Sequence, residues 1–402
     1  MKNIDFEKNT IFSRGTFALL AAVVLMVTFL AGYGTCIVQR CSQPDEFTLL
    51  SQAHGILREN FYGIAPDKTQ FEYGMIRGML SELEDPYTTF NEPGAAELDA
   101  DRRSGAFGGI GAHINKNSNG QFILTPLENY PAIRAGILTN DQLLSVDGNS
   151  ISTETTIEEV IWQIRGEIGT SVNLTIRTGT EAPRKLSISR IEIEIPSVSW
   201  HQMEQDTTIG VVDIERFSHN TENEAEEAVK ALVKSGVTRL ILDLRGNGGG
   251  LLESSVSVAN LFLEDGVIMY QASRGEKEES FHASSKEVAK DIPLVVLVDN
   301  YSASAAEIVA AALQEHDRAV LIGQQTFGKG SVQLIFNLAD DSSLHVTSAN
   351  WFTANRTAIE SKGITPDILI ETNGQSAEND LTLNRAVSFL NNSANENQHR
   401  SK

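Results

Sequence analysis

Lys329 lies in a glycine-rich stretch, GQQTFGKGSVQ (323–333), whose spacing is suggestive of chemistry. The stretch falls one residue short of the phosphate-binding pattern G-x-x-x-x-G-K-[ST], because Gly330 stands where serine or threonine is required. The residues that follow, SVQLIFNL, are typical of a strand, whereas phosphate binding needs a helix that directs its N–H groups at the anion. Nucleotide binding is therefore disfavoured. Lys329 remains a candidate catalytic base or a residue of a glycine-rich turn.

A serine at the start of a predicted helix is the second candidate. In DNYSASAAEIVAAAL (299–313), Ser304 and Glu307 form S-x-x-E, the pattern of a helix capping box. The stretch follows a buried strand, PLVVLVDN, and a serine at such a junction can also be an exposed nucleophile whose oxyanion lies over the helix N-terminus. These residues alone leave both interpretations open.

A third junction, DLRGNGGGLL (243–252), fails the dinucleotide-binding fingerprint, because Leu251 stands where the third glycine is required. Its N–H groups can still bind an oxyanion, although a structural turn is the simpler interpretation. No metal-ligand spacing such as H-E-x-x-H occurs, so metal chemistry is disfavoured. A histidine base is disfavoured as well, because no histidine stands in a recognisable motif. The histidines are His54, His113, His201, His219, His282, His316, His345 and His399.

The apolar pattern predicts the elements that position these junctions. Residues 46–84 show helical spacing in two segments separated by a turn. From about residue 193, apolar strands alternate with helices, which predicts an α/β architecture. The tail from about Asn373 is polar, and we expect it to be partly mobile.

Composition limits the classes of function. A chain of 402 residues has room for two or three domains. A formal net charge of −21 repels nucleic acids and anionic lipids, so neither is expected as a partner. The two cysteines, Cys36 and Cys41, both lie near the N-terminus, which excludes a disulfide scaffold or a cysteine metal site in the rest of the chain.

Residues 15–38 are uncharged and long enough to cross a bilayer as a helix. The basic residues Lys2, Lys8 and Arg14 precede them, which favours an N-terminus inside the cell and an exported body. We therefore expect a single-pass anchor in the cell membrane, with the rest of the chain on the extracytoplasmic side. The alternative is a cleaved signal peptide, which would leave a secreted protein.

The order of motifs between residues 104 and 177 resembles a PDZ domain. SGAFGGIGAHI (104–114) is followed by YPAIRAGILTNDQLLSVDGNSI, the helix TTIEEVIWQIRG and the strand TSVNLTIRTG. Glycines leave consecutive N–H groups open to an anionic chain end, and the adjacent strand edge can accept an extended peptide. The resemblance implies a carboxylate-binding loop made of Gly108, Gly109, Ile110 and Gly111.

A wider set of motifs, between residue 46 and roughly residue 371, resembles the carboxyl-terminal processing, or tail-specific, serine peptidases. The resemblance implies a Ser–Lys dyad on a ClpP/crotonase-like α/β core. Ser304 would be the nucleophile, Lys329 the general base and Gln333 the residue that orients Lys329. The motifs are DPYT (85–88), FGGIG (107–111), IRGEIGT (164–170), LDLRGNGGG (242–250), SASAAE (302–307), TFGKGSVQ (326–333) and GITPD (363–367).

The same resemblance implies an oxyanion hole formed by the N–H groups of Gly250 and Ala305. It also implies that Arg165, in the I-R-G motif, links occupancy of the PDZ domain to the active site.

A lysine base must be largely neutral when it works. Free lysine has a pKa near 10.4 and a useful base needs about 7–8, so burial must lower the pKa of Lys329. Phe327, Val332 and Ile335 are the apolar neighbours in sequence that we expect to bury it. An acidic partner would raise the pKa, so we expect Glu307 to cap its helix and not to pair with the Lys329 ammonium group.

These expectations define a membrane-anchored endopeptidase that binds polypeptides with an accessible, apolar C-terminus and needs no cofactor or metal. Residues 46–84 are a candidate interface for a homo-oligomer. The alternatives are a catalytically silent PDZ scaffold and a crotonase-type acyl-CoA enzyme. The expected parts are a cytoplasmic tail and transmembrane anchor (1–42), an N-terminal helical region (43–103), a PDZ domain (104–192), a Ser–Lys peptidase core (193–375) and a polar C-terminal tail (376–402).

Overall fold

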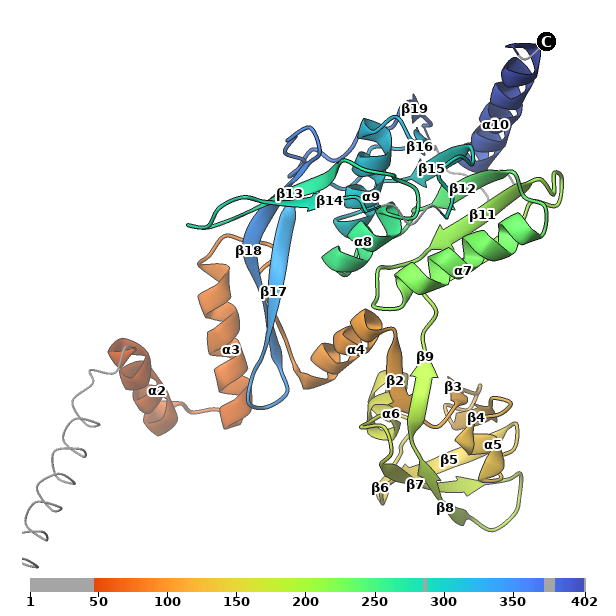
Figure 1. The fold of residues 1–402 in the computed structure, drawn as a ribbon. Helices are drawn as coiled ribbons and strands as arrows, with labels where there is room; N and C mark the ends of the chain where they lie inside the picture. Colours follow the sequence, from red (N-terminus) through yellow and green to blue (C-terminus); the bar gives the residue numbers. More distant parts are fainter. Residues whose placement is uncertain (1–46, 285–287, 372–379, 401–402) are drawn as a thin grey trace, which may run out of the picture. The chain divides into compact units, whose positions relative to one another are not determined.

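The computed structural model describes residues 47–284, 288–371 and 380–400 (Figure 1). The chain divides into two compact units at Gly74 and Met75. The expected membrane segment, residues 15–38, lies outside the described residues. Among the helices that are described, none is long and apolar enough to cross a membrane.

The predicted helical region contains α2 (Thr48–Asn60) and α3 (Lys68–Ser81). None of the residues of α2 is buried. Short helices gain most of their stability from packing an apolar face, so α2 presents a face that a partner could cover. Its exposed apolar side chains, including that of its C-cap residue, are Leu49, Leu50, Ile56, Leu57 and Phe61.

α4 (Pro93–Ser104) leads into the antiparallel domain. The chain enters this domain through β2 (Ala106–Gly109) and leaves it through β9 (Ile191–Glu194), and these two strands pair with each other. The main sheet of this domain has the order β3-β4-β5-β7-β8, so β3 is an edge strand. Its elements are β3 (Ala112–Lys116), β4 (Phe122–Pro126), α5 (Pro131–Arg134), β5 (Asp141–Val146), β6 (Asn149–Ser150), which pairs with β5, α6 (Ile157–Ile164), β7 (Ser171–Arg177) and β8 (Arg184–Ser189).

A capping box starts α6 at the boundary that the sequence indicates. Thr156 Oγ1 accepts a hydrogen bond from the N–H of Glu159 at 3.1 Å, and the Glu159 carboxylate accepts one from the N–H of Thr156 at 2.8 Å. The helix then packs Val160 and Ile164 into the core of the antiparallel domain, beside β3.

The second α/β region is built on a six-stranded sheet with the order β10-β11-β12-β15-β16-β19. β10 is antiparallel to β11, and the remaining pairs are parallel. This confirms the predicted alternation of buried strands and helices. The elements are β10 (Val198–Gln202), β11 (Ile209–Ile214), α7 (Thr221–Lys234), β12 (Arg239–Asp243), α8 (Leu252–Ala259), β15 (Leu294–Val298), α9 (Ala305–Glu315), β16 (Val320–Gly323) and β19 (Ile368–Leu369).

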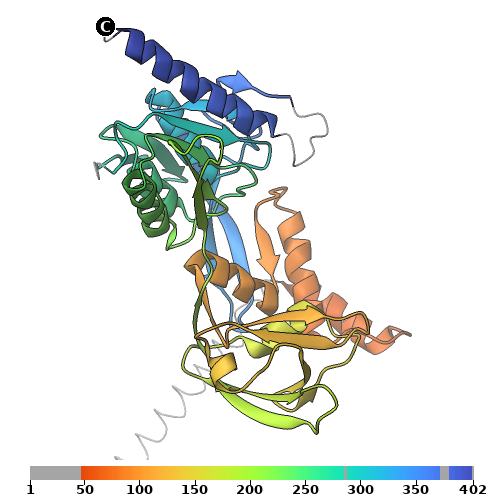
Figure 2. The same cartoon turned by 90° about the vertical axis from the view of Figure 1, so that its right-hand side faces the viewer.

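Side chains of this sheet alternate between two apolar cores. In β15, Val296 packs on the same side as helices α7, α8 and α9, whereas Val295 and Leu297 pack on the opposite side. α10 (Leu381–Arg400) covers that opposite side, where Ala386 and Leu390 are buried (Figure 2). We expect a partly mobile tail, and the structure has a helix over 381–400. The sequence does not indicate this helix, because apolar residues at helical spacing are sparse among the polar ones there.

A smaller antiparallel sheet completes the described chain, in the order β1-β18-β13-β14. β17 pairs only with β18, on the edge of β18 opposite to β1, and it follows Lys329 directly. The elements are β1 (Thr89–Asn91), β13 (Val267–Ser273), β14 (Glu279–His282), β17 (Ser331–Asn337) and β18 (Ser343–Thr353).

Parallel pairing brings the three junctions together. The glycine-rich segment follows β12, Ser304 follows β15, and the segment with Lys329 follows β16. Because carboxyl ends of parallel strands lie at one edge of the sheet, segments that are far apart in sequence meet there.

Parallel pairing also places two carboxylates side by side, since Asp213 of β11 is the register partner of Asp243 of β12. Burial, with the nearby charges of Asp243 and Glu215, raises the pKa of Asp213 to about 6, against the opposing effects of Arg245 and His201. The folded-state pKa thus lies above the ordinary value of 3.8, so ionisation of Asp213 disfavours folding as pH rises from about 4 to about 6.

We predict that Asp213→Asn increases the free energy of unfolding by about 1 kcal/mol at pH 7, because the partly solvated carboxylate retains only part of the full effect. The gain should shrink towards pH 4, where Asp213 is protonated in the wild type. Urea unfolding at pH 4, 5, 6 and 7 tests this. Asp265→Asn, the same substitution at an exposed aspartate, is the control. A gain that is constant with pH would contradict the assignment.

Candidate active site

Ser304 immediately precedes α9 in a strained backbone conformation. Its φ of 53° and ψ of −113° are rare for a residue other than glycine. A hydrogen bond of 2.8 Å from its N–H to the Glu307 carboxylate holds the junction. Ser304 also lines a cavity. A strained strand-to-helix turn that exposes a hydroxyl is the geometry of a nucleophile.

The glycine-rich segment packs against this junction. A Cβ atom on Gly249 would lie 2.9 Å from the carbonyl oxygen of Ala303 and 3.0 Å from Ser304 Cβ, and φ is +103°. A Cβ atom on Gly250 would overlap the backbone of Phe217, and φ is +145°. Glycine is therefore required at both positions. The close approach brings the segment alongside Ser304.

Two N–H groups at this place have no acceptor among the described residues, those of Gly250 and Ala305. Gly250 lines the cavity beside Ser304, and Ala305 is the first residue of α9. Free N–H donors next to a hydroxyl can stabilise a negatively charged oxygen that forms during its reaction.

Lys329 lines the same cavity as Ser304. Its Nζ donates a hydrogen bond of 2.6 Å to Gln333 Oε1 and lies 5.1 Å from the centre of the Tyr87 ring. Gln333 Nε2 in turn donates to the Tyr87 carbonyl oxygen, which fixes the amide. Burial lowers the pKa of Lys329, whereas the charges of Glu360 and Asp85 act in the opposite direction.

Glu307 joins the two segments that carry Ser304 and Lys329. Its side chain is 0% exposed. The carboxylate accepts hydrogen bonds from the N–H groups of Ser304 (2.8 Å), Gly328 (2.7 Å) and Lys329 (2.9 Å), and from Thr326 Oγ1 (2.5 Å). All four donors are neutral, and no hydrogen bond or ion pair joins Glu307 to the Lys329 ammonium group in the described chain. Glu307 therefore fixes the backbone on both sides of the site.

A cavity of 740 Å³ brings Ser304, Lys329, Gln333 and Gly250 together. No hydrogen bond joins Ser304 Oγ to Lys329 Nζ in the described structure, because Nζ donates to Gln333. Phe327 is 54% exposed, so it does not bury the lysine as we expect from the sequence. The aromatic surroundings come from distant residues instead, from Tyr87 and from Trp351, whose Nε1 donates to the Lys329 carbonyl at 2.9 Å.

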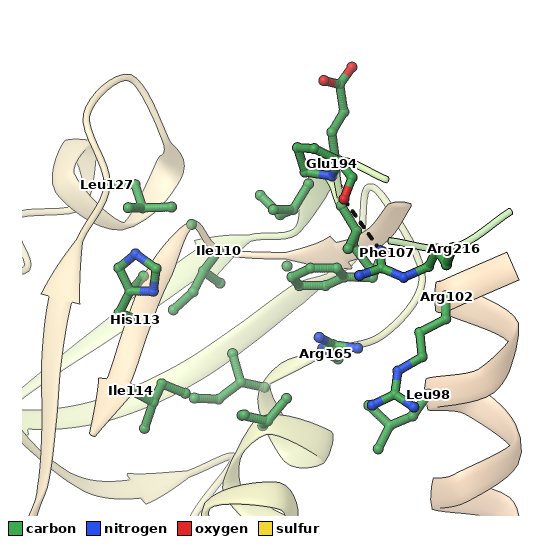
Figure 3. Close-up of a pocket in the computed structure, with 18 residues that line it drawn as sticks. Leu98, Arg102, Phe107, Ile110, His113, Ile114, Leu127, Arg165, Glu194 and Arg216 are labelled. Carbon is green, nitrogen blue, oxygen red and sulfur yellow. Dashed lines mark hydrogen bonds between the residues drawn. The ribbon is translucent and has the colours of Figure 1, made fainter. Parts of the chain in front are cut away.

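The expected carboxylate-binding loop lies in a second pocket, of 510 Å³ (Figure 3). Gly109, Ile110 and Gly111 line this pocket, whereas Gly108 packs against the backbone of Gly166. The N–H groups of Ile110 and Gly111 donate no hydrogen bond in the described structure, while their carbonyl groups accept bonds from Ala132 and Leu127. The loop thus offers free donors beside the edge strand β3.

Arg165 lies in the pocket of the antiparallel domain and not in the cavity of Ser304 (Figure 3). Its Nη1 is 2.6 Å from Asp101 Oδ2 on α4, and its guanidinium group lies 3.7 Å from the centre of the Phe107 ring. α4 also contributes Asp99 to the other cavity. Arg165 is therefore bonded to a helix that reaches both sites.

The sequence did not predict that Tyr87 contacts Gln333 and Lys329, or that Glu307 accepts hydrogen bonds from the segment of Lys329. Tyr87 belongs to the motif DPYT, which was a signal without an assigned role. Glu307 is recognisable as a capping residue, but its bonds to Gly328 and Lys329 depend on tertiary packing.

Comparison with known proteins identifies the family of the chain. Residues 208–370 match the model of peptidase family S41, and residues 108–188 match that of the PDZ domain. The chain is 35% identical over 359 residues to the carboxy-terminal processing protease CtpA of Bacillus subtilis (strain 168), covering 88% of this chain and 76% of the relative.

The chain belongs to the S41 family of carboxy-terminal processing proteases. A carboxy-terminal-processing protease of Bartonella bacilliformis is 37% identical over 318 residues, with 77% of this chain and 72% of the relative covered. Among solved structures, a photosystem II D1 C-terminal processing protease is similar, with 30% identity and a TM-score of 0.46 over 78% of this chain and 86% of that one. The family matches and the curated relatives show that the chain is a serine-type carboxy-terminal processing protease with a PDZ domain.

We predict that Glu307→Gln lowers kcat at least tenfold with a smaller change in KM. The amide replaces an acceptor oxygen by a donor, so one or two of the buried N–H groups lose their partner, at about 1–3 kcal/mol each. Steady-state kinetics and the melting temperature measure both effects. The matched control is Glu315→Gln at the other end of α9, whose carboxylate accepts from Asn355. Equal kcat in the variant and the wild type would contradict a positioning role for Glu307.

Proposed function

We propose that this protease uses a Ser–Lys dyad, with Ser304 as nucleophile and Lys329 as general base, to cleave polypeptides by acyl-enzyme hydrolysis. The observation that carries the proposal is the shared cavity, which is lined by a strained serine and by a half-buried lysine of lowered pKa. Free N–H donors of Gly250 and Ala305 beside the serine support an oxyanion hole.

In the proposed reaction, neutral Lys329 Nζ takes the proton of Ser304 Oγ as the oxygen attacks the substrate carbonyl carbon. The N–H groups of Gly250 and Ala305 stabilise the oxyanion. The Lys329 ammonium group then gives its proton to the leaving amine, and an acyl-enzyme remains. Lys329 next deprotonates a water molecule, and the hydroxide attacks the acyl carbon. The ester C–O bond then breaks, and the Lys329 ammonium group returns its proton to Ser304 Oγ, which releases the acid product. The steps balance without a metal or cofactor.

The dyad must close when substrate binds, because no hydrogen bond joins Ser304 Oγ to Lys329 Nζ among the described residues, where Nζ donates to Gln333. Catalytic hydrogen bonds are often long in substrate-free enzymes and tighten in the complex. Gln333 holds the lysine by one amide oxygen while its Nε2 is fixed on Tyr87, which supports an orienting role.

The PDZ domain would hold the end of the substrate chain. Free N–H groups of Ile110 and Gly111 suit a terminal carboxylate, and the free edge of β3 suits an extended chain. The apolar lining of the pocket, which includes Ile114 of β3 and Ile161 of α6, favours an apolar last residue. The bond of Arg165 to α4 supports, as a proposal, a link between this pocket and the active site.

The proposed parts of the chain are the anchor (1–42), the helical region (43–103), the PDZ domain (104–192), the peptidase core (193–375) and the C-terminal segment (376–402). The uncharged run at residues 15–38 supports a single membrane span with the protease on the extracytoplasmic side. Cleavage of this segment would instead give a secreted enzyme.

We predict that Ser304→Ala lowers kcat by at least about 10³-fold and that Lys329→Arg lowers it by about 10²–10⁴-fold. Arginine keeps the positive charge but cannot act as a base. The assay is cleavage of an unstructured polypeptide with an apolar C-terminus. Wild-type kcat should also fall as the pH falls through the lowered pKa of Lys329, because protonation removes the base.

Full cleavage by Lys329→Arg would exclude Lys329 as the base. No cleavage by the wild type, together with intact binding of the tail, would favour the alternative of a silent PDZ scaffold. Lys362→Arg, at an exposed lysine, is the control for the substitution itself.

The exposed apolar face of α2 supports a homo-oligomer formed through the helical region. We predict that Leu57→Glu lowers the molar mass measured by light scattering, since a carboxylate in an apolar contact is costly. Gln52→Glu adds the same charge to an exposed residue of α2 outside its apolar set and should leave the mass unchanged. An unchanged molar mass in both variants would exclude α2 as the interface of a homo-oligomer.

A further inference from the structure

β17 presents an edge to the cavity of Ser304, which residues of β13, β14 and β18 also line. Five consecutive residues of the strand, from Ser331 to Ile335, line that cavity. Successive side chains of a strand point to opposite faces, so an unbroken run can line one space only if the backbone edge is turned towards it. β17 pairs with β18 alone, which leaves its other edge free of any strand in the described chain.

The ladder with β18 identifies the backbone groups on the free edge. The N–H of Trp351 donates to the Gly330 carbonyl, and the N–H of Leu338 donates to the Ser342 carbonyl. These bonds flank two pairs of the ladder, Ser331 with Asn350 and Asn337 with Ser343, and make both of them non-hydrogen-bonded pairs.

Hydrogen-bonded and non-hydrogen-bonded pairs alternate along an antiparallel ladder, and the bulge adds its extra residue to β18 and not to β17. The pairs that Gln333 and Ile335 form with β18 are therefore also non-hydrogen-bonded. The N–H and C=O groups of Ser331, Gln333 and Ile335 therefore point away from β18, along the wall of the cavity. No hydrogen bond outside the ladder uses them in the described structure.

This edge also lacks the features that usually protect one. The strand SVQLIFN contains no charged residue and no proline, and Leu334 and Phe336 are 53% and 51% exposed. Free edges normally carry lysine, proline or a bulge, because an unprotected edge pairs with other chains. The only bulge in this ladder places its extra residue, Ser348, on β18.

We propose that the substrate segment to be cleaved binds as an added strand on the free edge of β17. The inference rests on the proposed function and extends it from the reacting groups to the binding of the chain on which they act. The edge begins two residues after Lys329 and shares its cavity, so a strand paired with Ser331, Gln333 and Ile335 leads directly to Ser304. Gly248 and Gly250 of the glycine-rich segment line the same cavity.

Strand addition imposes a period of two on the substrate. Alternate residues direct their N–H and C=O groups to β17, and the residues between them direct these groups away. The substrate must be extended over this stretch, so a helical or folded segment is excluded, and its affinity resides largely in main-chain bonds.

Peptides with single N-methyl groups test this period. In a peptide that the wild-type enzyme cleaves at one bond, each amide on either side of that bond is methylated in turn, omitting the scissile amide. On one side of the bond, we expect kcat/KM to fall roughly 5–30-fold at every second position and to change little at the positions between. Equal effects at neighbouring positions on both sides would overturn the proposal.

A substitution on the enzyme tests the same bond from the other side. Ile335→Pro removes an N–H that β18 does not use, so the ladder is retained while the free edge loses a donor. KM should rise roughly 5–30-fold at an unchanged melting temperature. Asn337→Pro removes a donor of the same orientation outside the cavity and should leave KM unchanged, as should Ile335→Val, which retains the N–H.

The outcomes separate this inference from the proposed function. Absence of any Ser304-dependent cleavage would contradict the proposed function. Cleavage without alternation in the methyl scan would overturn only the strand addition. A second copy of the chain on the edge is also distinguishable, because Ile335→Pro would then change the molar mass and not KM, which would likewise overturn the proposal.

Discussion

The buried carboxylate of Glu307 is the interaction on which the arrangement of the site depends. Ser304 and Lys329 lie on segments that follow different strands, and neither segment is a regular element at the point that matters. Glu307 accepts bonds from the N–H groups of both residues. Glu307 is fully buried and all its donors are neutral, so it forms no ion pair with them. Its hydrogen bonds instead fix the positions of the two backbone segments. Glu307 keeps the strained Ser304 and the segment that carries Lys329 at a fixed distance from each other.

The α/β sheet supplies the conditions for this contact. Because β12, β15 and β16 are parallel neighbours, their carboxyl ends deliver three loops to one edge, and the glycines at 249 and 250 allow the closest approach. A side chain at either glycine would displace the junction of Ser304 or the backbone of Phe217. The free N–H donors are therefore a result of the same packing that shapes the loop.

Local pattern predicted much of this fold, and its limits are physical. The strand-to-helix junctions, the helix α6 and the PDZ domain follow from short-range signals in the sequence. α10 was not predicted, because its buried residues Ala386 and Leu390 stand among many polar ones. Their role is visible only in the folded structure, where they pack against the sheet. The surroundings of Lys329 were also hidden. Phe327 is adjacent in sequence but exposed, whereas Tyr87 comes from a distant segment that no local rule connects to the lysine.

The state of Lys329 links its surroundings to the bound substrate. Burial lowers the pKa of Lys329, but Glu360 and Asp85 oppose the shift, so desolvation in the empty cavity is only part of what a neutral base requires. A substrate strand along β17 would displace water from the wall that Lys329 shares with Gln333. The lower local dielectric would favour the neutral amine further. Substrate binding on this edge would thus both position the scissile bond and complete the conditions under which the lysine acts as a base.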